Sequence, residues 1–228
     1  MKNIVFTLVI FIVSVPSFAH ISIITEPHFS NTYSQFEFAV PHGCQGFDTL
    51  RLEMTLPSAL TRVRPLDSVF GSAIVQTNDQ EEATKIIWTK STELYESDSH
   101  AYTVALRAKT PDTPFVTLYF PVVQVCLDAD QNEIQAAWVG MGGHDHGAES
   151  SELPAPSALL NPPRKLGWNN YYIDQHLHDL SIFNDAEIVW MENSAYSSSD
   201  HTMQLILEDE NVQLLEMIHP GSEIWVKY

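Results

Sequence analysis

The feature that most constrains the fold of this chain is a series of short segments in which polar and apolar residues alternate. In residues 34–40, Ser-Gln-Phe-Glu-Phe-Ala-Val, the alternation has the period of a β-strand with one buried face. Turn residues separate such segments, and we expect further strands at 21–25, 50–55, 69–76, 84–89, 101–107, 115–126 and 134–139. This pattern is typical of an antiparallel, immunoglobulin-like β-sandwich.

The composition changes after residue 140. Residues 141–163 are rich in glycine, proline and acidic side chains, which predicts a linker or a long surface loop. Further along we expect short helices at 177–183 and 199–207 and strands at 187–190, 212–217 and 223–226. We therefore predict a sandwich over residues 20–140, a linker over 141–163 and a small α+β extension over 164–228.

The first 19 residues have the pattern of an export signal. Lys2 supplies the positive charge, residues 4–15 form an apolar run, and small residues precede the expected cleavage between Ala19 and His20. The run is shorter than the roughly 20 residues that a membrane-spanning helix needs. We expect a periplasmic or secreted protein whose mature form does not span a membrane.

The exported part holds two cysteines, Cys44 and Cys126. An even number of cysteines in an oxidising compartment predicts a disulfide. A thiolate pair that holds Cu(I) or zinc is the alternative.

The chain is strongly acidic, with a formal net charge of −18. This charge argues against nucleic acid or an anionic membrane surface as a partner, and it raises the local concentration of cations. The sequence shows no Ser-His-Asp pattern, phosphate loop or nucleotide fingerprint, so it does not predict an enzyme of those classes.

Cleavage after Ala19 would make His20 the first residue of the mature chain. Its α-amine, which titrates near ~7.7–8.0, and its imidazole Nδ1 could then chelate one metal ion. Two nitrogen donors in one plane suit Cu(II).

Other histidines form weaker patterns. His144 and His146 flank an aspartate in a glycine-rich segment, which could load the main site or hold a second ion, or could be a solvated loop. His176 and His178 would share one side of a strand, but a solvated surface is the simpler interpretation. His219 belongs to no visible constellation.

Several motifs together resemble the YcnI-like family of exported copper-binding domains. They are Ala19-His20, the Val-Pro-His-Gly-Cys of residues 40–44, the Phe-Pro-Val-Val-Gln-Val-Cys of residues 120–126, and Trp138. Residues 167–169, 188–190, 195–197 and 223–228 are similar to the C-terminal extension of the proteobacterial members.

The resemblance implies a β-sandwich that binds one Cu(II) through a mono-histidine brace. His20 matches the histidine, and Trp138 matches a tryptophan that packs over the metal. The family's glutamate ligand falls at Thr103 or Ala101, which carry no carboxylate. Among the residues just upstream, which include Glu96 and Asp98, His100 is best suited to Cu(II) as the third ligand.

The function expected from these features is acquisition, storage or delivery of Cu(II) outside the cytoplasm, without catalysis. An unidentified copper chaperone or copper transporter of the envelope would be the partner. One alternative is a histidine-brace oxidase or monooxygenase, which would need a second histidine from His28, His42 or His100. Another is a metal-free structural or interaction sandwich.

Overall fold

The computed structural model describes residues 20–91, 93, 98–141 and 153–228. The expected signal segment and two candidate ligands, His144 and His146, lie outside the described residues. The described part is mainly β, as predicted, and its strands form four sheets. Its helical elements are the 3-10 helix η2 (Leu180–Phe183) and the helix α1 (Asp200–Glu208).

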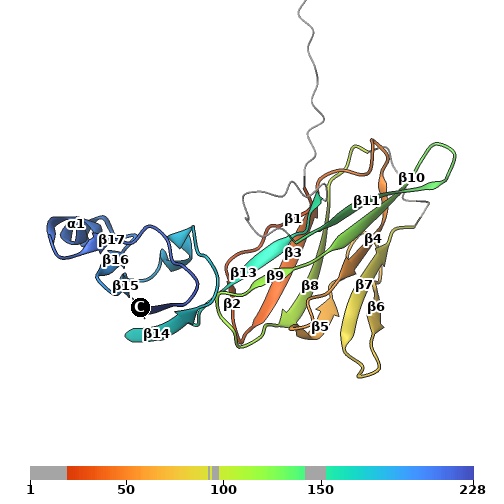
Figure 1. Ribbon diagram of the computed structural model, residues 1–228. Helices are drawn as coiled ribbons and strands as arrows, with labels where there is room; N and C mark the ends of the chain where they lie inside the picture. The colour runs from red at the N-terminus through yellow and green to blue at the C-terminus, as the bar shows by residue number, and fades with distance from the viewer. Residues whose placement is uncertain (1–19, 92, 94–97, 142–152) are drawn as a thin grey trace, which may run out of the picture.

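Two of the sheets form the predicted antiparallel sandwich (Figure 1). The order in the first sheet is β1 (Ser22–Ile23), β3 (Tyr33–Val40), β8 (Tyr102–Lys109), β5 (Thr61–Pro65). The order in the second is β12 (Leu153–Pro154), β11 (Glu133–Gly140), β10 (Val122–Leu127), β4 (Thr49–Thr55), β7 (Ala83–Thr89), β6 (Ile74–Thr77). Neighbouring strands run antiparallel except β11 and β12, which are parallel.

The alternation in residues 34–40 gives β3 one buried face. Phe36 and Phe38 are fully buried, and the residues between them point toward the other side of the sheet. They share one core cluster with Leu52 and Met54 of β4 in the second sheet. Burying each such side chain stabilises the fold by about 1.5–3 kcal/mol, so this strand is a main source of sandwich stability.

Part of the predicted linker is instead sheet. A third sheet joins β2 (His28–Phe29), β13 (Ser157–Asn161) and β9 (Thr117–Tyr119), and Ala158 and Leu160 of β13 are buried in the sandwich core. The prediction of a linker is therefore wrong for residues 153–161. These strands are short, prolines interrupt the segment, and their partners are distant in sequence, so little local periodicity marks them.

The strand β5 was also not expected from the sequence. Its pairing with β8 shifts register between Thr61 and Arg64, and Arg62 adopts a positive φ of 53°. Such a bulge breaks the two-residue period, which explains why alternation does not reveal the strand.

Residues 164–228 form the predicted α+β extension. The order of its sheet is β14 (Trp168–Ile173), β18 (Ser222–Lys227), β15 (Ile188–Met191), β16 (Ser194–Tyr196), β17 (Gln213–Leu214). The helix α1 confirms the helix expected at 199–207. Figure 1 shows the extension beside the sandwich, with α1 at the end away from it.

Phe115 connects the sandwich to the extension. Its backbone N–H donates to the Leu160 carbonyl of β13 at 2.7 Å. Its ring lies 5.5 Å from that of Tyr171 and 5.8 Å from that of Phe183, inside the separate core of the extension. The extension is therefore packed against the sandwich rather than only tethered to it.

Among the described residues, no helix is both long enough and apolar enough to cross a membrane.

Candidate metal site at His20 and Trp138

The structure places the imidazole of His20 against Trp138. Their ring centroids are 5.5 Å apart and their planes are inclined at 76°. His20 lies two residues before Ser22 of β1, which pairs with Ala39 of β3, whereas Trp138 comes from β11 of the other sheet. His20 is exposed and Trp138 is 1% exposed, so an accessible imidazole lies beside a buried indole.

Gln124, which sequence reasoning did not single out, anchors the indole. The Trp138 Nε1–H donates to the Gln124 Oε1 at 3.3 Å. The Gln124 Nε2 group donates to the His42 carbonyl and to the Thr49 hydroxyl, each at 2.7 Å. Because Gln124 is 1% exposed and uses both ends of its amide, it holds Trp138 and the residue 42 backbone in one network. A polar residue inside the apolar run 122–127 was the sequence signal for it.

The predicted disulfide is present beside this network. Cys44 and Cys126 are bonded with their Cα atoms 5.8 Å apart. Gly43, just before the bridge, has no room for a side chain, since an added Cβ would meet the Phe47 carbonyl oxygen at 1.7 Å. Its N–H donates to the Asp98 carboxylate at 2.6 Å. The 42–44 turn is therefore held from several sides.

The described residues place no third metal-ligating side chain beside His20 and Trp138. His100 is exposed, and its Nδ1 lies 3.2 Å from the Ser99 hydroxyl. Thr103 of β8 lies opposite Ala39 of β3, and Ala39 lies opposite Ser22 of β1. Thr103, Ala39 and Ser22 therefore form one row across the sheet. Within the described ranges, no group of three or more His, Cys, Asp or Glu side chains is arranged to hold a metal. Coordination by His100, and by His144 or His146 outside those ranges, stays a prediction.

A buried ion pair supports β8 behind this region. Lys90 and Asp48 are 3% and 1% exposed and form a salt bridge. The Tyr102 hydroxyl lies 2.9 Å from both the Lys90 Nζ and the Asp48 Oδ1. Burial disfavours the ammonium, but its hydrogen bonds to Asp48 and Tyr102 outweigh that effect and raise the pKa of Lys90. The Tyr102 side chain points toward the interior of the sandwich. Because side chains alternate along a strand, the next residue, Thr103, points outward.

The two other histidines near the N-terminal half are engaged elsewhere. The His42 Nδ1 lies 2.6 Å from the Gly43 carbonyl oxygen. His28 is buried and stacks on Phe36 with centroids 4.2 Å apart, and burial lowers the pKa of His28. Neither contact supplies a second imidazole beside His20.

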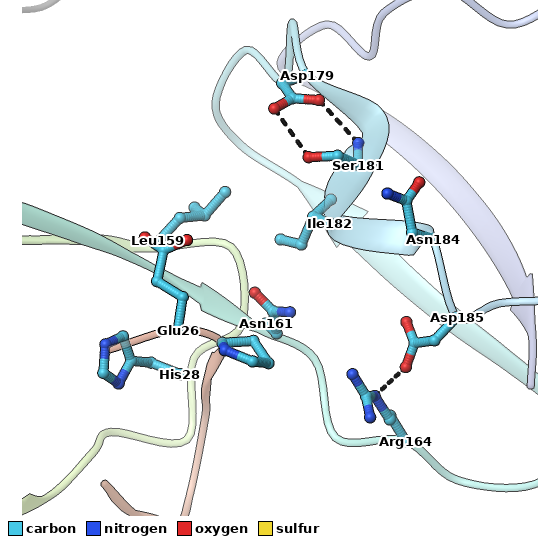
Figure 2. A pocket seen from close by; sticks show the side chains of 11 residues that line it. Glu26, His28, Leu159, Asn161, Arg164, Asp179, Ser181, Ile182, Asn184 and Asp185 are labelled. Atoms are coloured by element: carbon cyan, nitrogen blue, oxygen red, sulfur yellow. Dashed lines mark hydrogen bonds and ion pairs between the residues drawn. The ribbon is translucent and has the colours of Figure 1, made fainter. Parts of the chain in front are cut away.

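His28 instead lines a cavity of about 560 Å³ between the sandwich and the extension. Figure 2 shows His28 and Leu159 on its sandwich side and Asp179 and Asn184 on its extension side. The Asp179 carboxylate accepts from the Ser181 N–H and hydroxyl, each at 2.8 Å, and an ion pair joins Arg164 to Asp185. On the extension side of the cavity these groups therefore bind one another, whereas the buried Nε2 of His28 on the sandwich side has no hydrogen-bond partner among the described residues.

Comparisons with known proteins agree with this architecture. A family model described as "Domain of unknown function (DUF1775)" matches residues 20–160, a range that begins at His20 and ends within β13. Among curated proteins, none matches the chain. An uncharacterized protein from Nocardia farcinica, whose crystal structure reveals an immunoglobulin-like fold, is 24% identical with a TM-score of 0.50; the likeness covers 62% of this chain and 97% of that one.

A second solved structure is similar to a lower degree. BcpA, the major pilin subunit of Bacillus cereus, is 8% identical with a TM-score of 0.37, over 65% of this chain and 39% of that one, which is too distant to carry an argument. The Nocardia structure supports the immunoglobulin-like fold of the sandwich.

Proposed function

This chain belongs to the DUF1775 family, and from that premise we propose that it is an exported copper-binding protein of the YcnI-like type. It takes up, stores or hands on Cu(II) through His20 and has no catalytic activity of its own. The Cys44–Cys126 disulfide supports export, because disulfides persist in oxidising compartments.

The observation that carries this proposal is the contact between His20 and Trp138, with ring centroids 5.5 Å apart. Cleavage after Ala19 frees an α-amine on the same residue, so the amine and Nδ1 form one chelate on an exposed side chain. The buried indole beside it excludes water from one side, and its π face favours a nearby cation.

The donor set fits a cargo ion better than a catalytic one. His20 supplies two nitrogens, and the position where the family has a carboxylate, Thr103 or Ala101, carries none in this chain. A partner can displace a weak third ligand and remove the ion. An oxidase would need a second imidazole in the copper plane, and His28 and His42 are engaged in other contacts.

The test is a Cu(II) titration followed by EPR on protein whose N-terminus is verified as His20. A matched sample carries one additional alanine before His20, which removes the free amine from that residue and leaves every side chain in place. We expect the first equivalent to bind with nitrogen hyperfine structure, and the extended sample to lose about 100-fold or more in affinity. Equal affinity in both samples would overturn the proposal.

A Trp138→Phe variant tests the role of the indole. Copper bound at His20 is expected to quench the fluorescence that Trp138 emits. The variant lacks this emission, so copper should quench a smaller share of its total fluorescence. Unchanged quenching would place the copper away from Trp138.

A further inference from the structure

The extension brings together histidines that are far apart in sequence. Leu177 and Ile218 form an isolated antiparallel bridge, and each backbone N–H donates to the other's carbonyl, at 2.9 and 3.0 Å. Both side chains are buried, 3% and 0% exposed. Because side chains alternate along an extended chain, the residues on either side of them point outward. The antiparallel register places His176 opposite His219 and His178 opposite Met217.

The first of these pairs has the spacing of two ligands on one metal ion. The Nδ1 atoms of His176 and His219 are hydrogen-bonded at 3.2 Å, and a metal ion would replace the proton between them; their ring centroids are 5.1 Å apart. Two nitrogens bound to one ion at about 2.0–2.1 Å lie roughly 2.9 Å apart at a right angle and roughly 3.4 Å apart at a tetrahedral angle. The observed separation falls between these values.

The second pair supplies further donors next to the first. The His178 ring stacks on that of His176 with centroids 5.4 Å apart and planes inclined at 10°. Met217 is 38% exposed, although methionine side chains are commonly buried. A thioether beside imidazoles favours copper over zinc, and Cu(I) in particular, because the sulfur is a soft ligand.

We propose that this outward surface of the bridge, formed by His176, His178, Met217 and His219 and called the bridge face below, is a second copper site that prefers Cu(I). It is separate from His20, whose amine and imidazole suit Cu(II). The acidic charge of the chain, −18 overall, adds a general attraction for the cation.

The bridge face reaches its full donor set by side-chain rotation. Among the described residues, no three His, Cys, Asp or Glu side chains already converge on one point. His176 and His219 are placed by the backbone bridge, and His178 and the sulfur of Met217 then turn toward the ion about their own torsions. All four side chains are exposed, so such rotations disturb no core packing.

The test is an anaerobic Cu(I) competition with a chromophoric chelator on the mature chain carrying an additional alanine before His20 and the H144N and H146N substitutions. The added alanine removes the free amine from His20, and the two substitutions remove the imidazoles of His144 and His146. Cu(I) binding at the bridge face can then be measured without these competing groups. We expect one Cu(I) per chain, and a loss of about 100-fold or more in affinity when H176N and H219N are added. Met217→Leu should weaken Cu(I) binding about 10-fold or more while leaving Zn(II) affinity unchanged.

The matched control is His201→Asn, which removes an exposed histidine from α1 and should leave Cu(I) binding unchanged. Circular dichroism melting checks that every variant is folded. Absence of Cu(I) binding in the parent protein, or binding that H176N and H219N leave intact, would overturn the proposal. The Cu(II) titration with and without the added alanine is repeated on the H176N/H219N variant. A failure of the proposal for His20 can therefore be distinguished from a failure of the proposal for the bridge face.

Discussion

His20 and the histidines of the bridge face lie in opposite surroundings. His20 rests beside a buried wall in which Trp138, Gln124 and the 42–44 turn are fixed by hydrogen bonds and a disulfide. The bridge face is exposed, and two backbone hydrogen bonds between Leu177 and Ile218 position its side chains. His20 therefore lies beside side chains that several interactions hold in place, whereas the bridge-face side chains are exposed and depend on a single backbone bridge.

This comparison predicts that replacing a buried polar residue of the sandwich lowers the free energy of unfolding far more than replacing an exposed polar residue of the extension. The largest effect is expected for Lys90→Met, which leaves the Asp48 carboxylate buried without its ammonium partner. The free energy of unfolding in urea should fall by about 3–5 kcal/mol. The D48N/K90M double variant should recover part of this loss. A cost below about 1 kcal/mol for Lys90→Met would show that the pair is not buried in solution.

A smaller but more informative effect is expected for Gln124→Leu. This change leaves the Trp138 indole N–H and the His42 carbonyl without their partner, which should cost about 1–3 kcal/mol. The matched control is Gln135→Leu at an exposed position of β11, and its effect should stay within about 0.5 kcal/mol. Gln124→Leu should also change the copper-dependent quenching of Trp138. Equal effects of the two variants would contradict the role given to Gln124.

The smallest effect is expected in the extension, for Arg164→Gln. Its ion pair with Asp185 is about half exposed on the arginine side, at 47%, and such pairs contribute about 0–1 kcal/mol. The guanidinium also lies 4.6 Å from the Phe29 ring centroid, a contact across the joint with the sandwich. Urea unfolding measures the change, and a loss above about 2 kcal/mol would show that Arg164 contributes more than an exposed ion pair does.

Local patterns predicted much of the sandwich. The alternation around Phe36 and Phe38 identified β3 and its buried face, and the cysteine count predicted the Cys44–Cys126 bond, which the structure confirms. The strands at 153–161 were not predicted, because prolines interrupt the alternation of polar and apolar residues and the pairing partners of β13 are distant in sequence. The buried pair of Lys90 and Asp48 was not predicted for a similar reason. Nothing in the sequence around either charged residue indicates which residue it contacts.

The sequence alone determined the residue types available for chemistry: a histidine after an apolar N-terminal segment, a tryptophan in a segment of alternating polarity, and two cysteines. The tertiary structure decided which of them meet. His20 and Trp138 come together because their strands belong to the two facing sheets, and His176 meets His219 through one antiparallel bridge. Backbone periodicity is a local property that a sequence displays directly, whereas contacts between distant residues depend on strand order and register, which the whole fold settles at once.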